Sequence, residues 1–349
     1  MRLGLNLGYW GAGNDAENLV LAREADRLGY SVVWAAEAYG SDAATVLTWI
    51  AAQTEQIDVG SAIFQIPGRT PANTAMTAAT LDTLSGGRFR LGLGVSGPQV
   101  SEGWHGVRFT KPLQRTREYV DIVRMALARQ KVIYDGEFFT LPLPDGPGKA
   151  LTLTVHPVRE SIPIYLAAVG PKNLELTGEI ADGWLAIFFA PEKADEIMAP
   201  LVAGRASTGR TMEGFDVVPT IPVVFGDDVS ACADPIRFYS ALYVGGMGSR
   251  EKNFYNQLAS RMGYEQAAIE IQDKYLARDY DGAMAAVPLE FIDRTSLIGP
   301  RDRVRDRLSA YADAGVTTLT IATYAGDLQQ RLDTLRTMVD VLEESGLAS

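Results

Sequence analysis

Short apolar runs alternate with amphipathic helical patterns along almost the whole chain, and this alternation limits the fold more than any other feature. Apolar runs rich in Val, Ile, Leu and Trp predict eight strands, at 3–7, 31–36, 57–64, 88–95, 162–168, 183–188, 215–225 and 316–322. Strands separated by helices at roughly 25 to 40 residues form βαβ units in a parallel sheet. Eight such strands favour a closed barrel over an open sheet. We therefore predict an α/β fold, a (β/α)8 TIM barrel, with residues 1–349 as one domain.

Helical patterns fill the intervals between most of these strands. Helices are expected at 15–28, 42–55, 71–84, 112–130, 171–181, 190–206, 301–314 and 328–345. Two segments interrupt the repeat. Residues 131–158 hold several Pro and Gly residues and predict a hairpin excursion outside the barrel. Residues 228–294 show only helical patterns, which predicts a helical insertion between strands seven and eight, over the barrel mouth.

The charge and cysteine content exclude several functions. The 349 residues carry 43 acidic and 32 basic side chains, a formal charge of −11, which argues against nucleic-acid binding. The single cysteine, Cys232, excludes an internal disulfide and a cysteine-based zinc site and fits a reducing compartment. No secretory h-region or 18-residue apolar stretch is visible, so we expect a cytoplasmic protein without a membrane span.

The barrel prediction places the active site at the C-terminal ends of the strands. At the end of strand five, Gly170-Pro171-Lys172-Asn173 opens a helix directly after a strand. The free amides and the dipole at such a helix start attract anions, and Lys172 could add a full charge. This turn is a candidate phosphate site, with a plain strand-to-helix turn as the alternative.

No residue pattern indicates a metal or a nucleophile. The segment from Gly92 to Gly97 spells G-x-G-x-x-G, but it is not on the first strand and no helix is expected directly after it. We interpret its glycines as room for a planar ring against the backbone. Only two histidines, His105 and His156, are present, and neither has a metal-ligand spacing. No metal is predicted, and an organic cofactor would supply the missing chemistry.

Four segments of the sequence resemble the luciferase-like monooxygenase superfamily, and within it the coenzyme F420-dependent oxidoreductases of the actinobacterial, mycobacterial-type subgroup. These segments lie in the expected order, at 28–34 (LGYSVVW), 84–94 (LSGGRFRLGLG), 178–184 (GEIADGW) and 297–300 (LIGP). The resemblance implies a TIM barrel that holds a flavin or deazaflavin. FMN and F420 members share these motifs.

Three further resemblances favour F420 over FMN. Ser61-Ala62-Ile63 resembles the strand-three segment in which such enzymes carry a non-proline cis peptide behind the deazaflavin ring, here at Ser61–Ala62 or Ala62–Ile63. The segments 96–100 and 102–104 resemble an actinobacterial F420 subgroup. The turn at 170–173 matches the family's phosphate position. The cofactor contacts implied are Asn6, Glu37, Ser61, Ala62, Ile63, Val95, Ser96, Gly97, Ala168, Gly170, Pro171, Lys172 and Asn173.

The candidate proton-transfer residues are Glu37, Glu102 and His105, with Glu37 first. Several characterised F420 relatives carry an Asp-His or similar pair after strand two, where this chain has Glu37-Ala38. Their acid-base chemistry is therefore not transferred, and a structural carboxylate is the alternative role for Glu37.

Aromatic and basic residues near the predicted mouth have two interpretations each. Trp10, Trp104, Trp184 and Phe188 could wall a substrate pocket or belong to the core. Arg69 could meet the acidic tail of F420 or lie on the surface.

The predicted reaction is hydride transfer between F420 and a small organic substrate. The alternatives are an FMN-dependent monooxygenase and a non-catalytic F420-binding protein. The resemblance also implies a homodimer.

Overall fold

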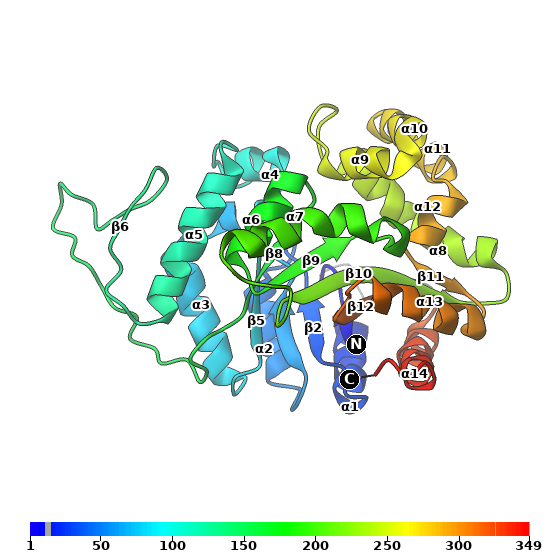
Figure 1. The fold of residues 1–349 in the computed structure, drawn as a ribbon, viewed down its shortest axis with the longest axis horizontal. Coiled ribbons are helices and arrows are strands. Elements are labelled where there is room, and N and C mark those ends of the chain that lie inside the picture. The colour runs from blue at the N-terminus through cyan, green and yellow to red at the C-terminus, as the bar shows by residue number, and fades with distance from the viewer. Residues whose placement is uncertain (11–14, 325, 349) are drawn as a thin grey trace.

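The computed structural model describes residues 1–10, 15–324 and 326–348, and its centre is a closed parallel barrel (Figure 1). Neighbouring strands pair in the order β10-β12-β1-β2-β3-β5-β8-β9, and β9 pairs with β10 to close the ring. This confirms the predicted TIM barrel. The barrel strands are β1 (Arg2–Asn6), β2 (Val32–Ala35), β3 (Asp58–Ser61), β5 (Phe89–Gly94), β8 (Ile164–Ala167), β9 (Gly183–Ile187), β10 (Asp216–Phe225) and β12 (Thr318–Thr323).

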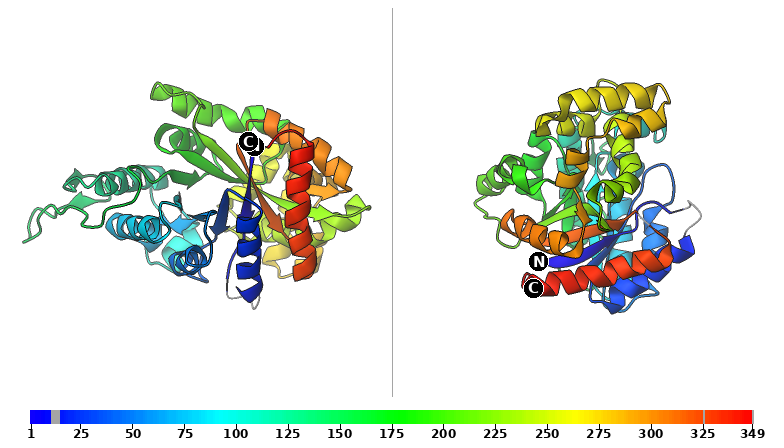
Figure 2. Two further views of the ribbon diagram at one scale, coloured as in Figure 1. Left: turned by 90° about the horizontal axis from the view of Figure 1, so that it is seen from below. Right: turned by 90° about the vertical axis from the view of Figure 1, so that its right-hand side faces the viewer.

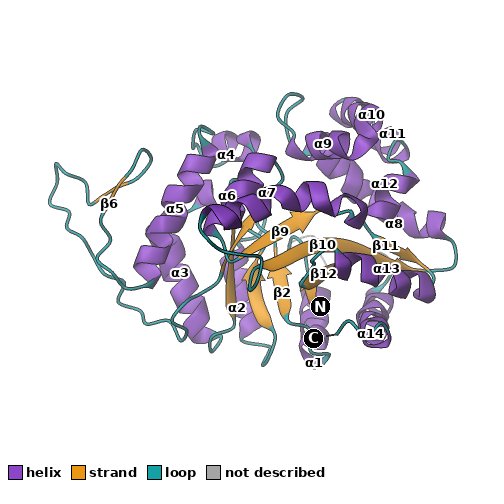
Figure 3. Cartoon of the chain, in the orientation of Figure 1, coloured by secondary structure: helices purple, strands orange, loops and turns teal. Residues whose placement is uncertain are grey.

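Helices surround this barrel, as Figure 3 shows by colour. They are α1 (Asp15–Arg27), α2 (Ala43–Ala51), α3 (Pro71–Leu84), α5 (Pro112–Leu127), α6 (Pro171–Ile180), α7 (Ala194–Ser207), α13 (Arg301–Asp313) and α14 (Leu328–Glu344). Local signals set several starts. Thr70 caps α3 with Pro71 in its first turn, and Asp327 forms a capping box with Gln330 at α14. Figure 2 shows the two termini side by side, where the Met1 amino group donates to the Leu347 carbonyl at 2.6 Å.

The predicted helical insertion lies between β10 and β12 and packs above the barrel in Figure 1. It contains α8 (Val229–Ala241), α9 (Phe254–Ala259), α10 (Glu265–Leu276), α11 (Tyr280–Ala285) and α12 (Leu289–Arg294), with π-helical segments at Leu242–Gly246 and Ser260–Tyr264. Buried apolar side chains of the insertion form a core cluster of their own, which includes Phe188 from the barrel. The insertion is therefore packed onto the mouth.

Residues 131–158 project away from the body of the molecule as a mostly irregular arm (Figures 1 and 3). The arm holds one short antiparallel pair, β6 (Tyr134–Asp135) with β7 (Thr140–Leu141).

Three short elements differ from the sequence expectation. Strand three is split into β3 and β4 (Phe64–Gln65), with the cis peptide Ala62–Ile63 between them. A strand, β11 (Leu297–Gly299), extends the sheet beside β10, and three residues are too few to show alternation. The helix α4 (Pro98–Gly103) begins directly after Gly97, where no helix was expected. Pro98 supplies its first-turn residue, which is the signal that the prediction missed.

An ion-pair network fills the end of the barrel opposite the mouth. Arg90 donates to Asp58 at 2.7 Å and to Asp216 at 3.3 Å, and the Tyr165 hydroxyl donates to Asp216 at 3.0 Å. Asp58 and Asp216 are the first residues of their strands, so this network stabilises the N-terminal end. The C-terminal ends are left for the site.

The described residues contain no helix with the length and apolarity to cross a membrane. Over the same residues, no group of three His, Cys, Asp or Glu side chains is arranged to hold a metal ion. Cys232 is buried and unpaired with any other cysteine.

Candidate functional site

The bulge at Ser61–Ile63 lies at the C-terminal end of strand three and is fixed by the neighbouring strand. The Ser61 hydroxyl donates to the Gly92 carbonyl at 2.8 Å and accepts from the Gly92 amide at 2.9 Å. The cis peptide lies at Ala62–Ile63, the second of the two predicted positions. The Ser61 side chain is fully buried, and its hydroxyl is already hydrogen-bonded to Gly92. Any cofactor contact at this bulge therefore comes from the backbone or from Ala62 and Ile63.

Two glycines of β5, Gly92 and Gly94, make room for this bulge. A Cβ at Gly92 would lie 1.9 Å from the Ser61 carbonyl oxygen, and one at Gly94 would lie 2.5 Å from Ile63 Cδ1. The expectation that these two glycines leave room for a planar ring was therefore wrong. They allow two strands to approach closely, and the bulge fills the room that they leave.

A chain of hydrogen bonds joins the C-terminal ends of β2, β4 and β5. The Ser96 hydroxyl donates to Gln65 Oε1 at 3.0 Å, and Gln65 Nε2 donates to the Ala38 carbonyl at 2.5 Å. Ser96 holds a left-handed backbone conformation at φ 60°. Gln65 is almost fully buried and was missed by the sequence reasoning, because a lone Gln after a strand carries no motif. These hydrogen bonds hold the segment after β5 in place, and the predicted contacts Val95, Ser96 and Gly97 lie on this segment.

Glu37, after β2, forms a partly buried ion pair. Arg69 Nη2 lies 3.2 Å from Glu37 Oε2, and the Ala43 amide donates to the same oxygen at 3.4 Å. Arg69 also pairs with Asp42 and stacks over the Phe64 ring at 4.6 Å. The Arg69 side chain is only 13% exposed, so the surface interpretation of this residue was wrong.

The proton affinity of Glu37 is set by opposing effects. Burial raises the pKa of Glu37, and it outweighs the Arg69 charge, which lowers it. A carboxyl group that keeps its proton to higher pH than free Glu suits proton transfer at neutral pH.

Glu102 and His105 do not contact Glu37. Glu102, on α4, accepts from the Phe109 amide at 3.0 Å and faces Arg108 at 4.0 Å, so it braces its own loop. The His105 ring packs against Gly68, and burial lowers the pKa of His105, which favours the neutral ring. Its Nε2 is buried with no hydrogen-bond partner among the described residues. Trp104 is 67% exposed, so it contributes no buried pocket wall.

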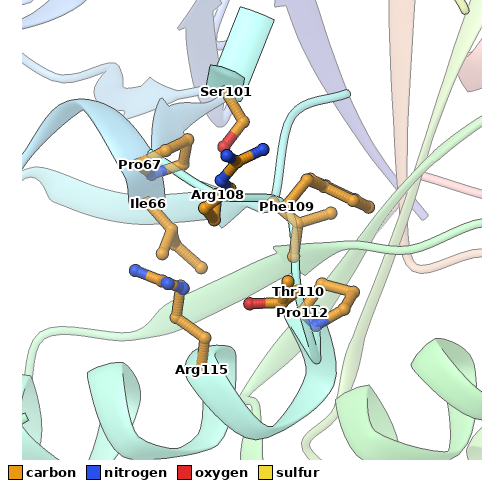
Figure 4. Close-up of a pocket in the computed structure, with 9 residues that line it drawn as sticks. Ile66, Pro67, Ser101, Arg108, Phe109, Thr110, Pro112 and Arg115 are labelled. Carbon is orange, nitrogen blue, oxygen red and sulfur yellow. The ribbon is translucent and has the colours of Figure 1, made fainter. Parts of the chain in front are cut away.

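A small pocket beside α4 is drawn in Figure 4. Ile66 and Pro67 lie on one side of it and Phe109, Thr110 and Pro112 on the other. Arg108 lies between them, and Arg115 reaches up from α5 below Ile66. Its cavity is about 10 Å³, which holds about one water molecule rather than a ring. Val95 and Ser101 also line this pocket.

A larger cavity of about 130 Å³ lies at the start of α6. Two predicted cofactor residues, Ala168 and Pro171, line it, as do Trp184 and Phe188. Lys172 is exposed and outside the lining, so the predicted charge at this position does not point into the cavity.

A basic side chain lines the cavity, and a polar atom without a partner lies close to the lining in the chain. The Asn173 Oδ1 atom, at the start of α6 but outside the cavity lining, is buried and has no hydrogen-bond partner within the described ranges. Arg261, from the second π-helical segment, lines the cavity and donates to the Val169 carbonyl at 3.1 Å. Burial lowers the pKa of Arg261, and no carboxylate of the described chain pairs with it. An exposed guanidinium without a carboxylate partner, beside a helix start, is suited to bind an anion.

Two other predicted residues have structural partners. Asn6 Oδ1 accepts from the Gly8 amide at 2.8 Å and so shapes the turn after strand one. Trp10 is buried against Trp49, with ring centroids 5.6 Å apart.

The sequence did not predict Arg261 as a site residue, because its segment has no motif. Only the fold brings it to the start of α6.

Known proteins resemble this chain along most of its length. A family model described as luciferase-like monooxygenase matches residues 8–318. The "Putative coenzyme F420-dependent oxidoreductase Rv3520c" of Mycobacterium tuberculosis is 44% identical over 95% of this chain and 97% of its own. The 5,10-methylenetetrahydromethanopterin reductase of Archaeoglobus fulgidus is 29% identical over 86% of this chain and 88% of its own.

Solved structures share the barrel. The coenzyme F420-dependent tetrahydromethanopterin reductase of Methanopyrus kandleri superposes with a TM-score of 0.82, at 23% identity, over 96% of this chain and 97% of its own. The oxygenating constituent of 3,6-diketocamphane monooxygenase from Pseudomonas putida, in complex with FMN, gives 0.71 at 18% identity over 99% and 98%. With the family model covering most of its length, the chain belongs to the luciferase-like monooxygenase family.

Proposed function

We propose that this protein is an F420-dependent oxidoreductase that transfers a hydride between the deazaflavin cofactor and a small organic substrate. The observation that carries the proposal is the cavity at α6, which Arg261 lines without a carboxylate partner among the described residues. The 44% identity to the M. tuberculosis relative, over nearly both full lengths, supports the choice of cofactor.

The residues present fit such a cofactor. Its phosphate would be held by the turn Gly170–Asn173 and by Arg261, and its ring by the bulge at Ala62–Ile63 and the edge at Val95–Gly97. When bound, the deazaflavin supplies two-electron hydride chemistry. The protein orients the ring, excludes water and holds a proton at the Glu37 carboxyl, which Arg69 keeps in place.

Binding of purified protein to F420 and to FMN, measured separately by fluorescence titration, tests the proposal. We expect tight F420 binding and FMN binding weaker by at least about tenfold. Tight FMN binding without F420 binding would indicate an FMN-dependent monooxygenase instead. F420 binding without turnover on a panel of enones, alcohols and aldehydes would indicate a non-catalytic binding protein.

The variant Arg261→Ala tests the phosphate end of the same site. A charge-assisted hydrogen bond contributes about 1.5–3 kcal/mol, so its loss is expected to weaken F420 binding about 10- to 100-fold. Arg250→Ala is the matched control, because Arg250 belongs to the same insertion but is 62% exposed and pairs with Asp273. Equal F420 affinity for the Arg261 variant and the native protein would remove Arg261 from the site.

We further propose that the protein is a homodimer in which the arm 131–158 contacts a second copy. The arm exposes the large apolar side chains Ile133, Leu143, Leu151 and Val158. Apolar side chains grouped on a projecting segment often mark an interface. Sedimentation equilibrium should give twice the 37.8 kDa mass of the chain, and a single monomer mass at micromolar concentration would contradict the dimer.

A further inference from the structure

Five tyrosines, here called the tyrosine cluster, gather at the barrel mouth from distant parts of the chain. Tyr9 follows β1 and Tyr324 follows β12, so both lie at the C-terminal ends of adjacent strands. Tyr239 belongs to α8, Tyr243 to the first π-helical segment and Tyr255 to α9. The cluster therefore joins the strand ends to the helical insertion.

The rings of the cluster are in consecutive contact. Centroid distances are 5.1 Å between Tyr324 and Tyr239, 4.7 Å between Tyr239 and Tyr243, and 4.9 Å between Tyr243 and Tyr255. Phe188, after β9, packs against three of these rings at 5.3 to 6.5 Å. Tyr9 lies near enough to Tyr243 for each phenol to affect the pKa of the other.

The backbone that carries Tyr243 is held from outside the cluster. Asn253 Nδ2 donates to the Tyr243 carbonyl at 3.1 Å and to the Val244 carbonyl at 2.9 Å. These bonds satisfy carbonyl groups in the π-helical segment, where the regular α-helical pattern is broken. Tyr243 is thus oriented before any ligand arrives.

The cluster presents neutral donors rather than charges. Burial raises the pKa of all five tyrosines, with further increases from neighbouring phenols. Among the described residues, only other tyrosines act electrostatically on the pKa values of Tyr239, Tyr255 and Tyr324, and no Arg, Lys, Asp or Glu does. Every phenol of the cluster therefore keeps its proton at neutral pH and can donate a hydrogen bond.

Tyr9 and Tyr324 give the cluster an accessible side. Each is 39% exposed, whereas Tyr239 is buried. Aromatic faces and phenol O–H groups together suit a ligand with an apolar ring and one uncharged oxygen, because burying a charge without a partner is costly. An anionic substrate would instead need Arg or Lys at this wall.

We propose that the tyrosine cluster is the substrate-recognition wall, and that the substrate is an uncharged carbonyl or hydroxyl compound with an aromatic or alicyclic body. The inference rests on the proposed function for the reaction, but the binding that it describes does not depend on turnover. A sugar phosphate is excluded at this wall by the same reasoning.

Acetophenone and benzoate are suitable probes, because both carry a benzene ring and only benzoate is charged. Their Kd values are to be measured by NMR titration of the F420-loaded protein and of the protein alone. We expect acetophenone to bind at least about tenfold more tightly than benzoate. Tyr243→Phe and Tyr9→Phe should each weaken acetophenone binding about three- to tenfold, the loss of one neutral hydrogen bond, and leave F420 affinity unchanged.

Tyr280→Phe is the matched control, since Tyr280 is exposed in the same insertion and packs on Tyr275 outside the cluster. The proposal is overturned if acetophenone does not bind, if benzoate binds as tightly, or if both cluster variants keep the native Kd. Failure of F420 to bind would contradict the proposed function alone, because the titration of the protein alone still reports on the cluster.

Discussion

Replacing Glu37 by Gln is expected to lower the rate of hydride transfer about 10²- to 10³-fold while changing the Kd for F420 less than about threefold. Gln keeps the shape and an oxygen that can accept from Arg69 and the Ala43 amide, which now bond the carboxylate. The titrating proton and the negative charge that faces Arg69 are lost, and general acid-base catalysis by a positioned side chain contributes about 10²- to 10⁴-fold. Single-turnover stopped-flow absorbance of the deazaflavin measures the rate directly.

The pH dependence of the hydride-transfer rate gives a second test of Glu37. Burial raises the pKa of Glu37, so the group stays protonated to a higher pH than free Glu. As a proton donor in substrate reduction, Glu37 should give a rate that is high at low pH and falls as the pH rises through its pKa. This limb should be absent in Glu37→Gln.

Asp42→Asn is the matched control for Glu37→Gln. Asp42 is the other carboxylate that faces Arg69, but its side chain is 48% exposed and caps α2 through the Thr45 amide. Asn caps helices about as well as Asp, so the variant should fold and keep most of its rate. Native hydride-transfer rates in Glu37→Gln would remove Glu37 from the mechanism.

The barrel could be predicted from the sequence because periodicity is a local property. The α3 helix was predicted with its observed bounds, since Thr70 and Pro71 mark its start and Gly86-Gly87 follow its end. The helical insertion was predicted for the same reason. In contrast, β11 is too short for any period to be visible.

The contacts within the site could not be predicted, because they join residues far apart in sequence. Arg69 meets Glu37 across 32 positions, and Arg261 meets Val169 across 92. The resemblance correctly placed the cis peptide at one of two bonds, but only the structure distinguishes them. The role of Gly92 and Gly94 in β5 was predicted wrongly, because the bulge that they contact belongs to another strand. Their spacing alone is equally consistent with room for a ring.

Gly92→Ala is expected to have the largest effect on the cofactor site. The added Cβ would lie 1.9 Å from the Ser61 carbonyl oxygen and 2.8 Å from Leu185 Cδ1, and the first of these is a backbone atom that cannot rotate away. The strands must separate, which breaks both hydrogen bonds between Ser61 and Gly92. Overpacking of this kind costs about 1–3 kcal/mol or more in the free energy of unfolding.

The bulge must move with Ser61, so F420 affinity should fall at least about tenfold in Gly92→Ala, as measured by fluorescence titration beside urea unfolding. Gly103→Ala is the control, because no atom beyond its chain neighbours and the backbone of its own helix lies within 4 Å of its added Cβ. If Gly92→Ala does not fold, Ser61→Ala removes the same two hydrogen bonds without adding an atom. Leaving the buried Gly92 amide unpaired should cost about 1–3 kcal/mol. Since the bulge then loses its anchor to strand four, native F420 affinity in a folded Ser61→Ala would show that the ring does not depend on this bulge.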